Sequence, residues 1–446
     1  MHKTFAHCFV LFILFTSFVF TLPVRAQGLT YYISTGGLDS NDGSSAHPWR
    51  TIQHGADQLL PGDTLLINPG VYQEGGITVT RGGTAAAPVT FKANGTGVII
   101  DKSGVGSRQD ALFITGADYV VVDGLTIQNA TRAGIRIDSS HHVTVRNSVF
   151  ANNKTWGLFT DFSDYTIVEN SESYGAVNQH GIYISNSSDY PTIRHNRLHD
   201  NAMCGLHMNG DISMGGDGII SHGLVEGNII YNNGTLGGSA INMDGVTDTI
   251  VRNNLLYNNH ASGISMYQID GGSGSRRNKI LNNTIIMPSN GRWAINIPEP
   301  DTSLPDPGNT FNQVYNNILY NLHPWRGVIT IGPSDLMGFS SDYNVLMDRL
   351  SSDGNDTVIS LAAWQAMGDD KHSLLSAPAQ LFINPGANDY HLSPSSPAID
   401  KGVFLSDVSN DLEGRPRPSG VTFDIGAYEY PGLKPYKLYL PGVLKP

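Results

Sequence analysis

The chain has 446 residues, only 15% of them charged, and its formal net charge is −12 at pH 7. This acidity disfavours nucleic acid and anionic membranes as partners, because binding to phosphates requires a basic surface. The 50 glycines, the many asparagines and the scarcity of charge favour turns and strands over helices.

Residues 1–26 have the pattern of a cleaved secretory signal. Lys3 gives a basic start, an apolar run covers residues 9–22, and small residues stand at Val24 and Ala26. The run is too short to span a bilayer comfortably, which disfavours the alternative of a membrane anchor. No other segment is long and apolar enough to span, so we expect a secreted, extracellular protein.

Removal of that signal changes the charge and the cysteine content. Without Lys3 and Arg25 the chain keeps 25 basic and 39 acidic residues, a net charge of −14. Cys8 is lost with the signal and Cys204 is left alone, so we expect an exported protein without an internal disulfide. About 420 residues can bury enough apolar surface to be stable without one.

A repeat organises the middle of the chain. One series of five-residue segments begins every 23 or 24 residues and then continues with longer gaps: GIRID (134–138), GLFTD (157–161), GIYIS (181–185), GLHMN (205–209), AINMD (240–244), GISMY (263–267) and AINIP (294–298). A second series with Asn-rich turns lies between these segments, for example VRNNLL (251–256). No single unit can bury its apolar face, so we expect the units to stack.

Units of about 22–24 residues with short strands are typical of a parallel β-helix, whereas propeller blades need about 40 residues. Alternation within each strand predicts one inward column: Ile135, Leu158, Ile182, Leu206, Ile241, Ile264 and Ile295. A second inward column follows two residues later: Ile137, Thr160, Ile184, Met208, Met243, Met266 and Ile297. The fold class predicted is all-β, a single-stranded right-handed parallel β-helix with an N-terminal cap and an irregular C-terminal region.

Asparagines recur at one turn of this predicted solenoid, at Asn196, Asn228, Asn254, Asn283 and Asn317. Stacked amides can hydrogen-bond along the solenoid and satisfy the buried backbone of the turn. We therefore interpret this column as structural.

The residues between the inward columns face outward. They form a stripe with the sequence Arg136, Phe159, Tyr183, His207, Asn242, Ser265 and Asn296. A flanking stripe contains Asp138, Asp161, Ser185, Asn209, Asp244 and Tyr267. Parallel pairing places residues of successive coils about 4.8 Å apart, so one surface collects aromatic, carboxylate, imidazole and amide groups. This mixture suits sugar rings; the alternative is a solvated sheet face without function.

Three long segments follow the same strand in their coils, at residues 210–222, 268–278 and 298–309. We expect them to lie side by side as one wall of a groove beside the stripe. Charged residues on these segments would line or cap the groove: Asp211, Asp217, Asp270, Arg276 and Arg277.

The opening at residues 31–74 (YYISTGGLDSNDG…), the repeats to about residue 330, and the ending at residues 382–430 (FINPGANDYHLSPSSPAIDKG…DIGAYEY) resemble one group of proteins. This is the secreted right-handed parallel β-helix superfamily of pectate-lyase-like proteins, with polysaccharide lyases, alginate epimerases and polygalacturonases. The resemblance implies a polysaccharide partner and an amphipathic cap at residues 51–60. The W-x-D-H and R-x-P-x-x-R motifs of one pectate lyase family, and the G-H-G signature of polygalacturonases, are absent.

These observations divide the chain into five parts: a signal peptide (1–26), the N-terminal cap and first coils (27–110), the repeats (111–330), C-terminal coils with a capping region (331–430), and a tail (431–446). The tail resembles a short sorting or attachment segment; the alternative is a frayed terminus. We expect a monomer.

β-Elimination of a uronic acid sugar requires a base, an acid, and a cation or hydrogen-bond donors for the carboxylate. Lysine is scarce in the repeats, so the predicted catalytic set combines histidine and tyrosine with a carboxylate to orient a histidine: His180, Tyr183, His207 and Asp211. The predicted substrate-binding set is Arg136, Phe159, Asn209, Asn242, Tyr267, Gln268 and Arg292. The alternative is that His180 is a turn residue and Tyr183 only a stacking platform.

Two other classes of function stay open. A glycoside hydrolase needs two carboxyl groups about 5 to 9.5 Å apart, for which Asp211 and Asp244 are candidates. The carboxylates of Asp244 and Asp270 are also candidates to bind Ca²⁺, the one cofactor that the sequence suggests. The third class is a surface solenoid that binds glycans without catalysis.

Overall fold

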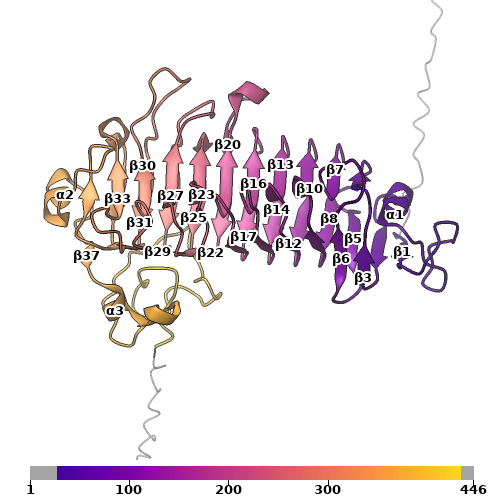
Figure 1. Ribbon diagram of the computed structural model, residues 1–446. Coiled ribbons are helices and arrows are strands. Elements are labelled where there is room, and N and C mark those ends of the chain that lie inside the picture. Colours follow the sequence, from indigo (N-terminus) through magenta and orange to yellow (C-terminus); the bar gives the residue numbers. More distant parts are fainter. Residues whose placement is uncertain (1–27, 433–446) are drawn as a thin grey trace, which may run out of the picture.

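The computed structural model describes residues 28–432. The predicted signal peptide and most of the predicted tail lie outside these residues. The chain winds into an elongated solenoid made of three long parallel sheets (Figure 1). The prediction of an all-β parallel β-helix is therefore confirmed.

Each coil adds one strand to each sheet, and neighbouring strands within a sheet are parallel. Sheet A contains β1 (Thr30–Ile33), β2 (Thr64–Ile67), β5 (Val89–Ala93), β8 (Val120–Asp123), β11 (Thr144–Arg146), β14 (Ile167–Glu169), β17 (Thr192–Arg194), β21 (Leu224–Glu226), β25 (Ile250–Arg252), β28 (Lys279–Leu281), β31 (Gln313–Tyr315) and β34 (Ser340–Asp342). Sheet B contains β3 (Gly70–Tyr72), β6 (Val98–Asp101), β9 (Thr126–Gln128), β12 (Val149–Ala151), β15 (Glu172–Tyr174), β18 (Arg197–His199), β22 (Ile229–Tyr231), β26 (Leu255–Tyr257), β29 (Thr284–Met287), β32 (Ile318–Asn321), β35 (Val345–Leu346) and β37 (Leu374–Leu375).

Sheet C carries the strands on which the outward stripe was predicted. Its members are β4 (Ile77–Val79), β7 (Leu112–Thr115), β10 (Ala133–Asp138), β13 (Trp156–Asp161), β16 (Ile182–Ser185), β19 (Leu206–Asn209), β23 (Ser239–Asp244), β27 (Ser262–Tyr267), β30 (Ile295–Ile297), β33 (Ile329–Ile331) and β36 (Leu350–Ser351). Two small pairs complete the strands: β20 (Ile220–Ser221) with β24 (Val246–Thr247), and β38 (Phe382–Asn384) with β39 (Asp389–Leu392).

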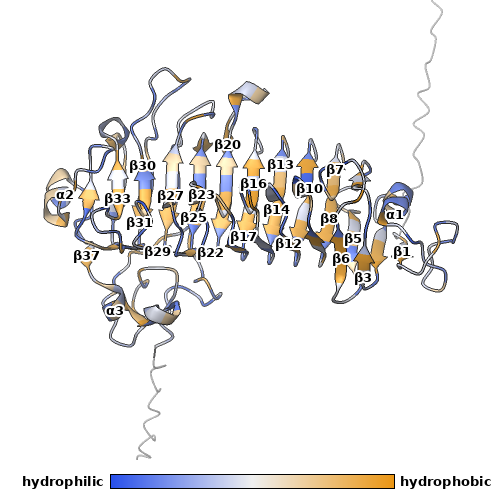
Figure 2. Cartoon of the chain, in the orientation of Figure 1, coloured by the Kyte–Doolittle hydropathy of each residue, from blue (hydrophilic) through white to orange (hydrophobic). Residues whose placement is uncertain are grey.

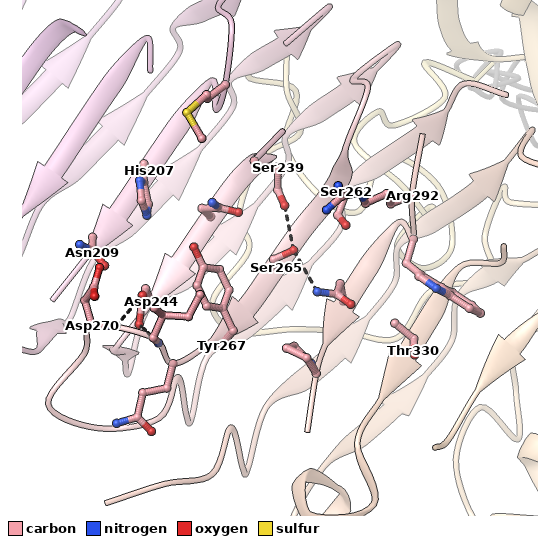
Figure 3. A pocket seen from close by; sticks show the side chains of 18 of the residues that line it. His207, Asn209, Ser239, Asp244, Ser262, Ser265, Tyr267, Asp270, Arg292 and Thr330 are labelled. Atoms are coloured by element: carbon pink, nitrogen blue, oxygen red, sulfur yellow. Dashed lines mark hydrogen bonds between the residues drawn. The ribbon is translucent and has the colours of Figure 1, made fainter. Parts of the chain in front are cut away.

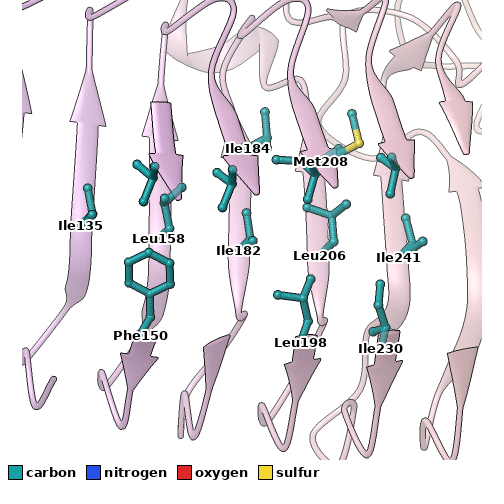
Figure 4. Close-up of a cluster of buried hydrophobic side chains, with 14 of the residues drawn as sticks. Ile135, Phe150, Leu158, Ile182, Ile184, Leu198, Leu206, Met208, Ile230 and Ile241 are labelled. Carbon is teal, nitrogen blue, oxygen red and sulfur yellow. The ribbon is translucent and has the colours of Figure 1, made fainter. Parts of the chain in front are cut away.

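The apolar core fills the interior of the solenoid. Every residue of both predicted inward columns is fully buried. Leu206 lies between Ile182 and Ile241 of the neighbouring coils, and Leu198 and Ile230 of sheet B pack into the same core (Figure 4). Figure 2 shows many hydrophobic strands joined by largely hydrophilic turns, while some strands of sheet C, such as β30, also contain hydrophilic residues.

The predicted asparagine column forms a continuous hydrogen-bonded ladder. The side-chain oxygen of Asn254 accepts from the backbone N–H and the side-chain amide of Asn228, both at 2.9 Å. Asn254 in turn donates to Asn283 at 2.9 Å and to the carbonyl of Val225 at 2.9 Å. The ladder satisfies buried backbone groups at every coil, which is the structural role predicted for it.

A second asparagine ladder lies at another turn and was not predicted. It joins Asn201, Asn233 and Asn259, which are all buried, through the same pattern of hydrogen bonds. Its signal in the sequence is the Asn-Asn pairs that follow the second strand of a coil, as in YNN at residues 231–233 and 257–259.

Short helices close the two ends of the solenoid. Helix α1 (Ile52–Gln58) packs on β1, β2 and β4, with Thr51 as its N-cap. This is the cap that the family resemblance implied at residues 51–60. Helix α2 (Leu361–Met367) contributes Leu361 and Trp364 to the main core at the opposite end (Figure 1). No helix in residues 28–432 is long and apolar enough to cross a membrane.

Residues 378–430 fold back along the side of the solenoid. They contain α3 (Pro378–Leu381) and pack a separate apolar cluster against Leu255, Ile286 and Ile318 of sheet B. A fully buried ion pair between Arg417 and Glu429, at 2.7 Å, holds this segment together. The short 3₁₀ helices of the chain are η1 (Ile212–Met214), η2 (Pro333–Leu336) and η3 (Pro385–Ala387).

The strand phase predicts different outcomes for two adjacent substitutions. Leu206→Asp places a carboxylate without a partner in the core, and we expect it to cost several kcal/mol of folding free energy. His207→Ala changes an outward residue and should cost much less, about 1–3 kcal/mol for the lost stacking on Tyr183 and the lost partner of His180. Calorimetry on both variants checks this, and equal losses would contradict the assigned phase.

The asparagine ladder predicts a large penalty for a small substitution. Asn254→Ala removes the acceptor of the Asn228 N–H inside the protein, and we expect a loss of about 3 kcal/mol or more, since each orphaned buried group costs about 1–3 kcal/mol. The matched control is Asn94→Ala, because Asn94 is exposed and its side chain bonds only to Asn68. Denaturant unfolding measures both, and similar midpoints for the two variants would refute the role of the ladder.

Candidate functional site

The outward stripe of sheet C has the register that the repeat predicts. Tyr183 pairs with His207, His207 with Asn242, and Asn242 with Ser265. Asn296 continues the stripe beside Ser265. The flanking stripe is also in register, with Asn209 beside both Ser185 and Asp244. Side chains more than one hundred residues apart in sequence therefore share one surface.

A further outward column precedes these stripes and was largely missed. It consists of the residue two positions before the first core residue of each strand: Trp156, His180, Cys204, Ser239, Ser262 and Trp293. Ser239 Oγ lies 2.8 Å from the outward Ser265 Oγ, which shows that both residues face the same side (Figure 3). Simple alternation would have placed this column inside, so only His180 was singled out.

A small residue stands between this column and the core. At Gly181 an added Cβ would lie 2.8 Å from the carbonyl oxygen of Gly205 and 2.8 Å from the amide nitrogen of Asn201. The close approach of successive coils therefore favours glycine at position 181, and the equivalent positions of the other coils hold glycine or, at Ala240 and Ala294, alanine. This preference explains the recurring Gly-Ile, Gly-Leu and Ala-Ile pairs that begin each repeat.

These columns form the floor of a groove of about 1040 Å³. Its walls come from residues 268–270, 298–301 and 354–356. Ten of the predicted site residues line this groove: His180, Tyr183, His207, Asn209, Asn242, Asp244, Tyr267, Gln268, Asp270 and Arg292. Other lining residues were not predicted, among them Glu299, Asp301, Arg326 and Asp356. Glu299 and Asp301 belong to the predicted wall segment 298–309 but were not singled out, whereas Arg326 and Asp356 lie on loops where periodicity gives no signal.

The three long segments lie side by side, as predicted. Ile212 N–H donates to the Asp270 carbonyl at 3.0 Å, and Gly274 N–H donates to the Asp306 carbonyl at 3.1 Å. The first segment, however, supplies no lining residue. Asp211 is instead the N-cap of η1, where its side chain accepts from Ser213. The structure therefore does not support Asp211 as the residue that orients a histidine.

Several other predicted residues lie away from the groove. Arg276 pairs with Asp306 at 2.9 Å and Arg277 with Asp248 at 2.7 Å. Asp217 is exposed outside the lining. The two ion pairs of Arg276 and Arg277 join neighbouring segments of the chain, whereas Asp217 accepts from Ile219 within its own loop.

Arg136 and Phe159 continue the stripe beyond the end of the groove. The Arg136 guanidinium is 3.0 Å from Asp161 and 3.2 Å from Asp138, and it lies over the rings of Phe113 and Phe159. Two carboxylates already neutralise this cation, so it is poorly suited to bind the carboxylate of a sugar.

The two histidines of the groove are joined to each other. The backbone N–H of Cys204 donates to His180 Nδ1 at 3.2 Å, and His180 Nε2 is 3.1 Å from His207 Nδ1. Tyr183 stacks on the His207 ring with centroids 4.8 Å apart and planes inclined by 9°. The Tyr183 hydroxyl accepts from the Asn209 amide at 3.0 Å. Hydrogen bonds to the Cys204 backbone and to the Asn209 amide, together with the stacking of Tyr183 on His207, therefore hold the cluster in place.

Burial keeps these groups neutral at pH 7. It lowers the pKa of His180 well below its ordinary value, and the neighbouring His207 lowers it further. Burial also lowers the pKa of His207 to about 3 and raises the pKa of Tyr183. A desolvated site disfavours the charged form of each residue.

Asp244 anchors the second long segment to the floor of the groove. Its Oδ1 accepts from the N–H groups of Ile269 and Gly271, at 2.8 and 3.2 Å, and its Oδ2 accepts from Asp270 N–H at 3.1 Å. Burial raises its pKa to about 6 in spite of these bonds, and the nearby Asp270 carboxylate also raises it. The pKa of Asp244 therefore lies closer to neutral pH than that of an ordinary aspartate.

Two arginines supply positive charge at the other end of the groove. Arg326 is 3.4 Å from Asp356. Arg292 is exposed, and its side chain has no hydrogen bond or ion pair within residues 28–432. No lysine lines the groove. Arg292 is therefore the cation best placed to meet an anionic ligand.

Three buried polar atoms of the lining lack a partner: His207 Nε2, Asn209 Oδ1 and Gln268 Oε1. Buried polar groups are normally paired, so unpaired ones within a groove point to a ligand or to water. One donor and two acceptors match the hydroxyl groups of a sugar, which both donate and accept.

Two groups of side chains are candidates for a metal ion. His180, Cys204 and His207 place ligand atoms within 4.8 Å of one another. However, His180 Nδ1 accepts from an amide, so the proton of the neutral ring must be on Nε2, and that nitrogen has no lone pair for a metal. At the predicted Ca²⁺ pair, Asp244 already accepts three backbone bonds while Asp270 is exposed, and calcium binding there stays a prediction.

Comparison with known proteins identifies several relatives. The uncharacterized protein YwoF of Bacillus subtilis (strain 168) is 26% identical over 236 residues, 50% of this chain and 46% of that protein. Pectate lyase L of Dickeya dadantii (strain 3937) is 29% identical over 157 residues, 32% of this chain and 36% of that protein. The chain therefore matches less than half the length of these curated relatives.

Solved structures share the fold. Pectate lyase Pel9A has a TM-score of 0.64 at 16% identity, and the match covers 91% of this chain and 97% of that chain. An alginate lyase from Paenibacillus sp. str. FPU-7 has a TM-score of 0.50 at 18% identity, covering 68% and 98%. The model of the Pel9A-like right-handed β-helix region matches residues 31–290, which is more than half of the chain. With this match and the solenoid described above, the chain belongs to the Pel9A-like right-handed β-helix family.

Proposed function

We propose that the protein is a secreted polysaccharide lyase that cleaves a uronic-acid-containing chain by β-elimination in the groove over sheet C. The observation that carries this proposal is the presence in one groove of an unpaired guanidinium, Arg292, and a carboxylate with a pKa of about 6, Asp244. The positive charge of Arg292 is complementary to the carboxylate of a uronate. The pKa of Asp244 suits a base that acts near neutral pH.

The relatives support the substrate class. Pectate lyase L and pectate lyase Pel9A are named for a polymer of uronic acid, and an alginate lyase shares the fold. The unpaired polar atoms of His207, Asn209 and Gln268 also favour a sugar ligand, because they offer one donor and two acceptors to hydroxyl groups.

In the proposed reaction the base removes the proton at C5 of the uronate. The C4–O4 bond breaks, a C4–C5 double bond forms, and the leaving oxygen receives a proton. Asp244 is the proposed base, since Oδ2 accepts only one amide bond and keeps a lone pair. Tyr183 is the proposed acid, because burial keeps its phenol protonated. Arg292 lies at the other end of the groove, two coils and six strand positions from Asp244, so it is proposed to bind the carboxylate of another uronate unit of the same polymer.

A glycoside hydrolase is supported less well. The carboxylate pair predicted for hydrolysis was Asp211 and Asp244, and only Asp244 lines the groove. A binding module without catalysis would use the same floor and walls, so product formation separates it from a lyase.

The first test measures activity on polygalacturonate, alginate and a glycosaminoglycan. A lyase produces an unsaturated sugar that absorbs in the ultraviolet, and we expect this product from one of these polymers. Asp244→Asn and Arg292→Ala should each lower kcat/KM by about 10²-fold or more, the usual scale for losing a positioned base or an electrostatic contact.

The control for these variants is Arg194→Ala on sheet A, where Arg194 pairs with Glu169 away from the groove. It should keep full activity, and melting temperatures should show that all variants are folded. Reducing sugar without the unsaturated product would indicate a hydrolase. Glycan binding without any product would indicate a binding module, and either outcome would contradict the proposal.

The second test uses the pKa of Asp244. A base acts as its ionised form, so kcat/KM should be level above about pH 6 and fall roughly tenfold per pH unit below it. The remaining activity of Asp244→Asn should lack this dependence. A rate that increases as the pH falls below 6 would show that the group must be protonated, which would rule out Asp244 as the base.

A further inference from the structure

The hydrogen bonds around His180 determine where its proton lies. The N–H of Cys204 is a donor, so His180 Nδ1 must be the acceptor and carries no proton. A neutral imidazole has one N–H, which must then be on Nε2. That nitrogen is 3.1 Å from His207 Nδ1, so His180 donates and His207 accepts.

The same reasoning extends to His207. Its Nδ1 accepts from His180 and carries no proton, so the neutral ring holds its proton on Nε2. His207 lines the groove, and Nε2 is buried without a partner in residues 28–432. Both ring nitrogens are thus assigned, and neither keeps a lone pair for a proton from the substrate.

We infer that His180 is a positioning residue that fixes His207 as a neutral N–H donor toward an oxygen of the bound sugar. The inference differs from the sequence-based hypothesis that a histidine and a tyrosine together supply the base and the acid. The orientation of the two protons depends only on the geometry of the chain, whereas the sugar oxygen as acceptor depends on the proposed function. In a lyase the donor would stabilise the charge that develops on the carboxylate or on the leaving oxygen.

Pairing between successive coils fixes the position of the Cys204 backbone amide, which donates to His180. The Cys204 carbonyl accepts from Gly181 N–H at 3.0 Å, as part of the pairing between successive coils. The His180 carbonyl accepts from Gly157 N–H at 3.2 Å in the coil before. The backbone N–H of Cys204, and not its thiol, therefore fixes the proton of His180, so the side chain of Cys204 can be replaced.

The tautomers can be measured directly on the free protein. NMR of protein labelled with ¹⁵N-histidine reports which ring nitrogen carries the proton, and the signals are assigned by the loss of one set in His180→Gln and in His207→Gln. At pH 7 we expect both rings to be neutral with the proton on Nε2, and Cys204→Ser to leave this unchanged. A proton on Nδ1 of either ring, an imidazolium, or a change in Cys204→Ser would overturn the inference.

Activity then separates a donor from a base. His207→Ala should lower kcat by about 10²–10³-fold, as for the loss of a single donor to a developing oxyanion. His207→Gln should recover at least about tenfold of that loss, because its amide offers an N–H but cannot act as a base. Equal loss in both variants would overturn the donor role.

The positioning role of His180 is tested by its effect on His207. In His180→Ala we expect the His207 signals to show both tautomers and kcat to fall, with KM changed little. An unchanged His207 tautomer in this variant would overturn the positioning role. Failure of the lyase proposal can be distinguished from failure of this inference. The first appears as the absence of unsaturated product from the unmodified protein, whereas the tautomers are measured without substrate.

Discussion

Parallel stacking of the coils in exact register is the constraint on which the rest of the structure depends. Each strand hydrogen-bonds to the same strand of the next coil, so a residue takes its environment from its position in the repeat. The core columns, the asparagine ladders and the outward stripes are all products of this register. A shift of one residue would exchange Leu206 with His207 and place an imidazole in the core.

The register also explains why the site contains buried polar groups. Side chains of successive coils lie close enough to exclude water from one another, as Tyr183 and His207 do through stacking. Burial then keeps the histidines and the tyrosine neutral and raises the pKa of Asp244. The loops add what the stack does not provide, namely cations such as Arg292 in the lining of the groove. A floor of stacked strands with walls of loops suits the binding of an extended polymer.

Periodicity in the sequence was sufficient to predict the fold, the core columns and the order of the stripe. Periodicity failed at the start of each strand of sheet C. Cys204 and Ser239 lie two positions before a core residue, so alternation would place them inside, but they face outward beyond the intervening glycine or alanine. It also could not place Asp211, because a turn at the start of an inserted segment depends on local hydrogen bonds. Residues such as Asp356 reach the groove through tertiary folding of loops, which no repeat records. The protons on His180 and His207 depend on one backbone N–H and become visible only in three dimensions.

We propose above all that a polysaccharide binds to the outward face of sheet C, between Tyr183 and Thr330. The most direct measurement is a crystal structure of Asp244→Asn with an oligosaccharide of the polymer that the protein acts on or binds. We predict sugar rings along the floor of the groove, with a carboxylate at Arg292 and an oxygen within hydrogen-bonding distance of His207 Nε2. Sugar bound on sheet A or sheet B, with the groove over sheet C empty, would contradict the account.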